Sequence, residues 1–325
     1  MIAIHVDKVR SIQSNFFNEI EEQREIAITK LKKLNKKTTN LKDKTYLEEV
    51  ILLFDSNPDI LLWDSIKINN EKDKFRSLPT YPKTSKTGKV TLCKTEIKDK
   101  ILTALGYRNL RSSFYPMYFK EIGIKSCVYC NSQLTISAKR SSVTNDYSAK
   151  FDVDHYHSKS EYPFLSICLF NLYPACSSCN RIKSDNVVEF ELYTNNRIKA
   201  IKSDYKFKLT AYSKAKYLIT KDPKDIGFTF DEPTPSNITT KTINDVFHIE
   251  GIYQTQTDLI EELIIKSQIY NKSYLKTLKY NFDKLSIQPE LFKRTLVGNY
   301  TGDKDLHKRP MSKLVSDIAK DLGLI

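Results

Sequence analysis

The sequence predicts an α+β fold, in which a short strand-containing core lies between two mainly helical regions. Apolar residues recur at helical spacing in residues 1–115 and 258–322, whereas residues 190–212 include segments that alternate as half-buried strands do. We therefore divide the chain into a helical N-terminal region (1–115), a core (116–190) and a C-terminal region (191–325) with a small sheet followed by helices.

The N-terminal region is expected to hold several helices. Residues 15–34 carry acidic side chains early and basic ones late, as the helix dipole favours, and further helices are expected at 46–54, 58–68 and 94–106. Between them, residues 72–89 contain Pro79, Pro82, Gly88 and many lysines, which predicts a loop. This loop could lie on a phosphate backbone or simply be a solvated connector.

Two C-x2-C pairs mark the core, Cys127 with Cys130 and Cys176 with Cys179. Thiolates at this spacing chelate one soft ion, and two pairs complete the closed tetrahedral shell that structural zinc prefers. The alternative is two unrelated thiol pairs in a reducing cytosol. The pattern predicts a structural zinc site.

Harder ligands lie between and directly after the cysteine pairs, namely Asp154, His155 and Asn180. A closed zinc shell cannot activate water, so any chemistry must lie at these three residues. An Asp-His pair alone is commonly a surface feature. Adjacent residues of a regular strand point to opposite faces, so the strand must bend or end here for both side chains to reach one phosphate. A helix from near Cys176 would place Asn180 and Lys183 on one face.

These elements together resemble the HNH, or ββα-metal, endonucleases. The matching residues, in order, are Cys127-Val-Tyr-Cys130, Asp154-His155, Asn171-Leu172, Cys176-Ser-Ser-Cys179-Asn180 and Lys183. The resemblance covers residues 120–186, and the family usually has proline where this chain has Ser158. It implies a zinc-stabilised ββα-metal core.

The resemblance also implies roles for the individual residues. His155 would be the general base, since a neutral imidazole can take a proton from water, and Asp154 and Asn180 would hold Mg²⁺ or Mn²⁺. Asn171 would brace the intervening loop. We assign contacts with nucleic acid to Lys159, Arg181 and Lys183.

The function that this implies is metal-dependent hydrolysis of DNA phosphodiester bonds. Two alternatives remain open from the residues. One is an RNA-directed nuclease, because one imidazole and one cation do not distinguish the two sugars. The other is a non-catalytic, zinc-stabilised module that binds nucleic acid or protein.

Outside these motifs the sequence is less informative. Residues 131–150 are expected to form a surface hairpin, with nucleic-acid contact as the alternative, and Cys93 and Cys168 are expected to be buried free thiols. Strands are expected at 190–193 and 205–212. A proline-containing linker at 222–236, a long helix at 258–285 and shorter helices at 288–296 and 311–322 should follow.

The C-terminal segment, residues 299–325, resembles the tails of stand-alone bacterial HNH proteins, some of which lie beside ATPases in Septu-type anti-phage operons. This implies bacterial anti-phage defence or restriction. The chain contains no Gly-x4-Gly-Lys-Ser/Thr motif, so any ATP dependence would come from a partner ATPase subunit. Cutting both DNA strands would be simplest with two copies, which makes a homodimer a further hypothesis.

Composition fits a nucleic-acid partner. The chain of 325 residues is 40% hydrophobic and carries a net charge of +13, which favours a polyanion, although a Lys-, Asn- and Ile-rich chain can also reflect an AT-rich genome. No apolar run is long enough to span a membrane, and no secretory signal pattern opens the sequence. We expect a cytoplasmic protein with no membrane association.

Overall fold

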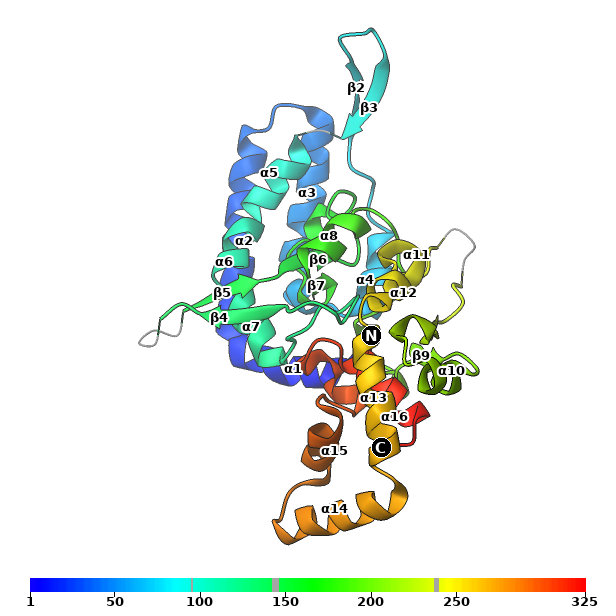
Figure 1. Cartoon of the computed structure of the whole chain (residues 1–325). Helices are drawn as coiled ribbons and strands as arrows, with labels where there is room; N and C mark the ends of the chain where they lie inside the picture. Colours follow the sequence, from blue (N-terminus) through cyan, green and yellow to red (C-terminus); the bar gives the residue numbers. More distant parts are fainter. Residues whose placement is uncertain (95, 142–145, 237–239) are drawn as a thin grey trace.

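The computed structural model describes residues 1–94, 96–141, 146–236 and 240–325, and it combines helices with small sheets (Figure 1). The described residues form five two-stranded sheets, which is compatible with the α+β class. Buried residues from Met1 to Leu324 make one continuous hydrophobic cluster.

The N-terminal region is mainly helical. Its helices are α1 (Val6–Gln13), η1 (Ser14–Phe16), α2 (Phe17–Lys37), α3 (Leu41–Ser56), η2 (Ile60–Leu62), α4 (Ser65–Lys72), α5 (Ile97–Ala104), α6 (Tyr107–Ser112) and α7 (Tyr115–Ile122). Helix α2 buries Ile20, Ala27 and Leu31 and packs against α3 and α5. The expected helices at 15–34 and 46–54 are confirmed as α2 and α3.

Two expectations for this region are wrong. Residues 58–68 do not form one helix, because Asp64 is extended and its side chain caps a new helix, α4, by accepting from the Lys67 amide at 3.0 Å. The predicted loop at 72–89 contains the first strand of a hairpin, β2 (Thr80–Thr84) with β3 (Val90–Lys94), which projects from the body of the protein (Figure 1). Cys93 was expected to be a buried free thiol, and its side chain lies outside the described part of the structure.

The core contains two antiparallel strand pairs and a helix. The strands are β4 (Ile136–Lys139), β5 (Tyr147–Lys150), β6 (Asp152–His155) and β7 (Leu172–Ala175), and the helix is α8 (Ser177–Lys183). The β4–β5 pair confirms the hairpin expected within 131–150. In the β6–β7 pair, Asp154 lies opposite Tyr173 and His155 opposite Leu172. Strand β6 ends at His155, where the sequence required the strand to bend or end.

The C-terminal region contains β8 (Tyr193–Thr194), α9 (Arg197–Ile201), β9 (Lys206–Leu209), α10 (Ser213–Thr220), η5 (Pro223–Asp225), β10 (Phe228–Asp231), α11 (Ile243–Phe247), α12 (Ile249–Gln254), α13 (Thr257–Ile269), α14 (Lys272–Lys284), α15 (Pro289–Val297), η6 (Asp303–Lys308) and α16 (Ser312–Asp321). Helices α15 and α16 confirm those expected at 288–296 and 311–322.

Three details of this region differ from expectation. Strand β8 does not pair with β9; it runs parallel to β1 (Ile4–His5), near the start of the chain. The partner of β9 is β10, which lies inside the expected linker because Phe228 and Phe230 turn one apolar face to the core. The expected long helix is two helices, because the Asn271 side chain caps α14 by accepting from the Tyr274 amide at 3.0 Å.

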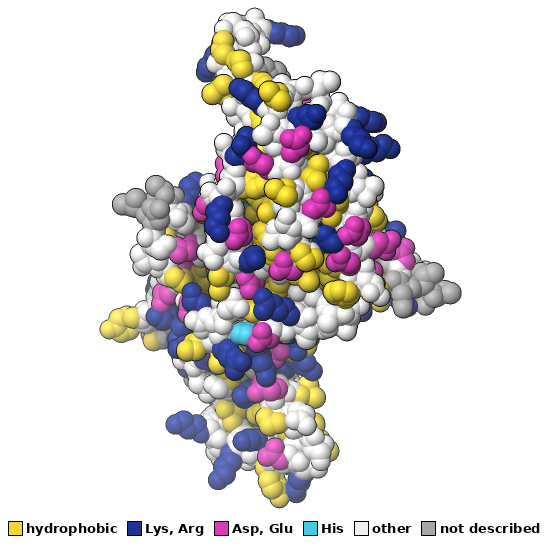
Figure 2. Space-filling view, turned by 180° about the vertical axis from the view of Figure 1, so that it is seen from behind, with side chains coloured by type: hydrophobic (Ala, Val, Ile, Leu, Met, Phe, Trp, Pro, Cys, Tyr) yellow, Lys and Arg dark blue, Asp and Glu magenta, His cyan; other side chains and the backbone are white. Residues whose placement is uncertain are grey.

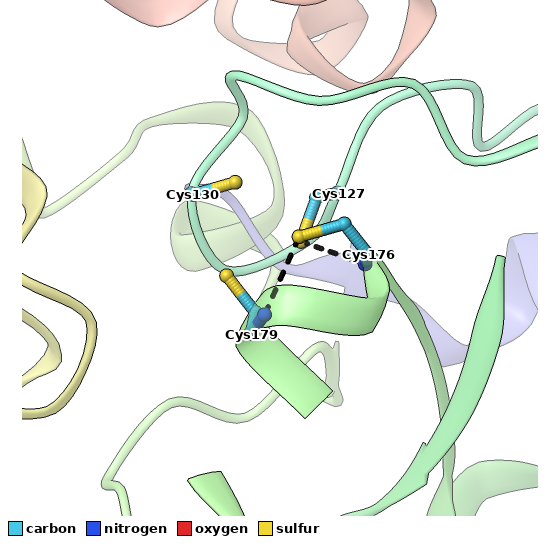
Figure 3. A group of neighbouring side chains, drawn as sticks. All are labelled: Cys127, Cys130, Cys176 and Cys179. Carbon is cyan, nitrogen blue, oxygen red and sulfur yellow. Dashed lines mark hydrogen bonds between the residues drawn. The ribbon is translucent and has the colours of Figure 1, made fainter. Parts of the chain in front are cut away.

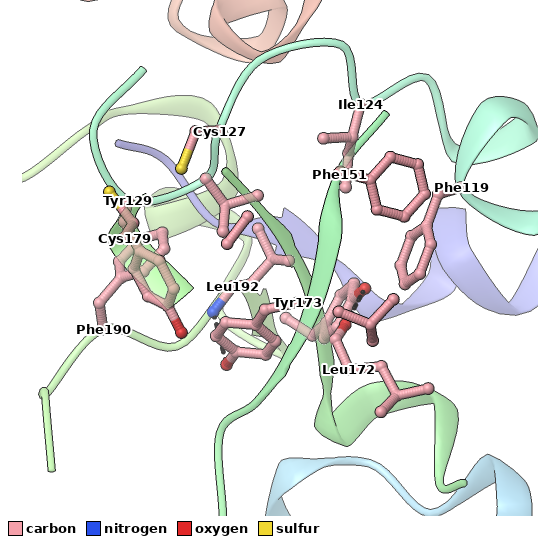
Figure 4. Close-up of a cluster of buried hydrophobic side chains, with 14 of the residues drawn as sticks. Phe119, Ile124, Cys127, Tyr129, Phe151, Leu172, Tyr173, Cys179, Phe190 and Leu192 are labelled. Carbon is pink, nitrogen blue, oxygen red and sulfur yellow. Dashed lines mark hydrogen bonds between the residues drawn. The ribbon is translucent and has the colours of Figure 1, made fainter. Parts of the chain in front are cut away.

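The interior around the core strands is rich in aromatic rings (Figure 4). Tyr173 of β7 stacks against Tyr156, and its hydroxyl accepts a hydrogen bond from the Leu192 amide at 2.8 Å. Phe119 of α7 contacts Phe151 edge-on, with ring centroids 5.6 Å apart. Helix α7 therefore packs against the residue that directly precedes β6. Among the described residues, no helix combines the length and the apolar character that crossing a bilayer requires.

Candidate functional site

The four cysteines of the two pairs converge at the start of α8 (Figure 3). Their Sγ atoms all lie within 4.8 Å of one another. Four thiolates around zinc at the usual bond length of about 2.3 Å would be separated by roughly 3.8 Å, so the cluster matches a tetrahedral sulfur site after a small contraction. The arrangement fits the predicted metal site, with zinc as the ion that this ligand set favours.

Backbone amides help to place the sulfur atoms. Cys176 is the N-cap of α8, where its Sγ accepts from the Cys179 amide at 3.4 Å, and Cys127 Sγ accepts from the Cys176 amide at 3.3 Å (Figure 3). Hydrogen bonds with Cys127 and the other neighbouring thiols lower the pKa of Cys130, whereas burial raises the pKa of Cys127. A cation would favour the deprotonated form of all four groups.

Asp154, His155 and Asn180 all line a cavity of about 480 Å³. Asp154 and His155 come from the end of β6, and Asn180 comes from the middle of α8. The opposite wall comes from α5 and α6. The three residues to which the sequence analysis assigned chemistry therefore face a common space.

Asp154 is buried and bound by two polar side chains. Its Oδ2 atom accepts from the Tyr129 hydroxyl at 2.5 Å and lies 3.1 Å from the Lys183 ammonium. Burial raises the pKa of Asp154, and the Lys183 charge opposes that shift. Both side-chain contacts use Oδ2, and a carboxylate offers a second oxygen with its own lone pairs.

His155 is also buried, and its ring orientation is defined by one hydrogen bond. Nε2 lies 3.1 Å from the Ser166 carbonyl oxygen, which can only accept, so Nε2 carries the hydrogen and Nδ1 of the neutral ring is the proton acceptor. Tyr107 packs against the imidazole, with centroids 5.0 Å apart. Burial, together with the Lys159 charge, lowers the pKa of His155 to about 3, so the ring is neutral at physiological pH.

Asn180 is half-buried on α8. Its backbone amide donates to the Cys176 carbonyl at 2.9 Å, and within the described part of the chain its side-chain amide makes no hydrogen bond. Its oxygen and that of Asp154 are hard donors, which suit Mg²⁺ or Mn²⁺ and leave coordination positions for water and phosphate. The donor chemistry of this cavity fits a divalent cation.

Asn171 holds the chain that leaves β6. Its Oδ1 accepts from the His157 amide at 2.7 Å, and its Nδ2 donates to the carbonyls of His157 and Leu165, both at 3.1 Å. These bonds join the start of the β6–β7 loop to its middle. The polypeptide after His155 is thereby held in place although this chain lacks a proline at Ser158.

The three residues assigned to nucleic-acid contact lie in different environments. Lys159 lines the cavity, with its ammonium 4.8 Å from the centre of the Tyr107 ring. Arg181 is exposed on α8 and is not part of the cavity lining. Lys183 is only 2% exposed, and its ammonium donates to the His155 carbonyl at 2.9 Å as well as pairing with Asp154. Lys183 therefore contacts the site from inside the protein, not from the surface as expected.

Several cavity residues were not identified from the sequence. These residues are on α5 and α6, which precede the motif of residues 120–186 and contain no metal-binding or catalytic motif: Lys98, Tyr107, Arg108 and Arg111. Tyr129 donates to Asp154 from within the first C-x2-C pair. Its position between two predicted zinc ligands was the one available signal that it would lie near the site.

Comparisons of the chain with protein-family models, curated proteins and solved structures found no match.

Proposed function

We propose that this protein is a metal-dependent endonuclease of the HNH type that hydrolyses DNA phosphodiester bonds. The observation that carries the proposal is the shared cavity: Asp154, His155 and Asn180 line one space, and Asn180 directly follows Cys179 of the four-cysteine cluster. A general base and two oxygen donors facing one solvent-connected space are what phosphodiester hydrolysis with one cation requires.

In this mechanism His155 takes a proton from the attacking water. Nδ1 is the atom that accepts it, because Nε2 is held by the Ser166 carbonyl. Burial keeps the imidazole neutral, so Nδ1 keeps its lone pair, and the same lowered pKa makes it a weaker proton acceptor than an exposed imidazole. Lys183 donates to the His155 backbone carbonyl and so fixes the residue at its backbone as well.

The remaining cavity groups would bind the cation and attract the negatively charged phosphate. Asp154 and Asn180 would hold the cation, which, when bound, supplies positive charge to the phosphate and to the departing oxygen. Lys159 and Arg108 add positive charge to the cavity wall and can attract the phosphate. The four cysteines hold the first C-x2-C pair against α8, and α8 carries Asn180.

A second candidate function follows from the Lys183–Asp154 ion pair. A lysine at 3.1 Å already neutralises the carboxylate that would hold the cation, as expected of a structural core in a non-catalytic nucleic-acid-binding module. Under this alternative, DNA binding is equal with and without divalent cations and no product forms.

The test is incubation of the zinc-loaded protein with supercoiled plasmid in Mg²⁺, in Mn²⁺ and without added divalent cation, alone and with the proteins encoded beside it. We expect nicked or linear product only when a divalent cation is present. Plasmid that stays intact under every condition contradicts the proposal. Cleavage of RNA but not DNA in a parallel digestion contradicts the assigned substrate.

A further inference from the structure

We propose that double-stranded DNA flanking the cut lies along a basic track formed by Lys30, Lys33 and Lys37 of α2, Lys100 of α5 and Arg108 of α6. This inference rests on the proposed function, since it names the surface that binds the substrate of the same cavity. All five side chains line a second, wider hollow of about 780 Å³.

The two hollows share part of their lining. Asp99, Thr103 and Arg108 line both the catalytic cavity and the wider hollow, so the boundary between them is a shared wall of α5 and α6. Between α5 and α6, Gly106 adopts a left-handed conformation (φ +76°), and the chain turns there so that Arg108 reaches both spaces. A polymer whose phosphate enters the cavity can extend into the wider hollow without leaving the surface.

The lysines of α2 share one face of the helix. Positions 30, 33 and 37 are spaced three and four residues apart, which brings their side chains to one side of the helix. Along the helix axis they span about 10 Å. This length corresponds to the axial rise of about three base pairs of duplex DNA.

Four of the five charges have no ion-pair partner among the described residues. Within the described residues Lys30, Lys33, Lys37 and Arg108 form no ion pair, and Lys100 is 3.4 Å from a single exposed carboxylate, that of Glu96. Residues 30–37 contain no acidic side chain at all. Figure 2 shows Lys and Arg interspersed with Asp and Glu over much of the face that it draws.

Helix stability alone does not account for the track. Basic residues in the last turn of α2 complement the helix dipole, which explains Lys37 but not Lys30 or Lys33. Arg108 is near the N-terminus of α6, where the dipole disfavours a cation. A polyanion that contacts α2, α5 and α6 together accounts for all of these positions. Because the hollow shares Asp99, Thr103 and Arg108 with the proposed catalytic cavity, we infer that this polyanion is the nucleic-acid substrate.

The test is equilibrium binding of a labelled DNA duplex, measured over a range of salt concentrations without added divalent cation so that no cleavage occurs. The variant combines Lys30→Gln, Lys33→Gln and Lys37→Gln. Its matched control combines Lys272→Gln, Lys276→Gln and Lys279→Gln, three exposed lysines on one helix, α14, that do not line either hollow. Both variants lose the same charge.

Each phosphate contact contributes about 0.9 to the slope of log K against log salt. If each of the three substituted lysines contacts one phosphate, the slope of the track variant should be shallower than that of the wild type by about 2.7, while the control variant keeps the wild-type slope. Equal slopes for the two variants overturn the track. If the protein cleaves plasmid but the two variants have equal salt slopes, only the track is contradicted. If the salt slopes differ but no cation supports plasmid cleavage, the track is supported and the proposed nuclease activity is contradicted.

Discussion

Asp154 and Lys183 form a buried ion pair, and both side chains are under a tenth exposed. A buried charge without a partner is costly, so each member depends on the other for its place in the core. The pair also joins the end of β6 to the end of α8, the two elements that carry His155 and Asn180. The geometry of the cavity therefore depends on this contact.

This contact gives a prediction for stability. Lys183→Met leaves the Asp154 carboxylate buried without a counter-charge and should lower the free energy of unfolding by about 3 kcal/mol. Combining it with Asp154→Asn removes both charges and should restore part of that loss, so the two changes are not additive. Urea denaturation of both single variants and the double variant measures the coupling.

An exposed pair supplies the control for this cycle. Lys32 and Asp55 lie 2.9 Å apart with both side chains at least 41% exposed, so Lys32→Met should cost less than about 1 kcal/mol. Strictly additive effects of Lys183→Met and Asp154→Asn would contradict the coupling proposed here.

At the residue scale, ligand identities were easier to infer from sequence than their surroundings. Spacing indicated that Asn180 and Lys183 share a helix face, but it could not say that this face turns inward at Lys183 and makes it a partner of Asp154. Periodicity gives relative directions around a helix, whereas burial depends on which other elements pack there. The cysteine spacing, in contrast, is a local constraint, and the four sulfur atoms do converge.

At the scale of elements, the four-cysteine cluster brings the first C-x2-C loop next to the start of α8. The loop supplies Cys127 and Cys130, and the first turn of α8 supplies Cys176 and Cys179. Metal binding to such a cluster can contribute on the order of 10 kcal/mol to folding. We infer that the position of Asn180 relative to Asp154 depends on the bound ion.

The prediction at this scale concerns metal content. Cys176→Ser removes one thiolate but keeps an oxygen that can cap α8, since serine is a favoured N-cap residue. We expect Cys176→Ser to lose bound zinc, measured by elemental analysis, and to have a lower melting temperature. Because serine preserves the helix cap, these losses would report the missing zinc ligand. Cys168→Ser is the control, because Cys168 is buried away from the cluster and its thiol contacts the Ile60 carbonyl at 3.2 Å. Wild-type zinc content in Cys176→Ser would contradict the four-cysteine site.

Some element boundaries could not be predicted from sequence because they depend on the local contacts of single side chains. Asn271 interrupts an apolar stripe that otherwise continues from α13 to α14, and its capping hydrogen bond ends one helix and begins another. The β2–β3 hairpin has few buried residues, so the alternating pattern that marks half-buried strands is absent there. Helices α2 and α16, which have a clear apolar face, were predicted well.

At the scale of the whole molecule, the cavity is built from two regions. The motif between residues 120 and 186 supplies Asp154, His155 and Asn180, whereas α5 and α6 supply the opposite wall. The pairing of β1 with β8, almost 190 residues later, also joins distant parts of the chain. Such long-range contacts leave no periodic signal in one sequence, so the motif was recognisable but its basic wall was not.

The central claim is that His155 acts as the base in a metal-dependent cleavage of DNA, and one comparison tests it most directly. The initial rate of plasmid cleavage is measured for the wild-type protein and for His155→Ala, both with Mg²⁺ or Mn²⁺, after equal zinc content and folding have been verified. We predict cleavage by the wild-type protein and a rate at least about a hundredfold lower for the variant, the usual contribution of a general base. A fully folded, zinc-loaded His155→Ala protein that cuts at the wild-type rate would contradict the account.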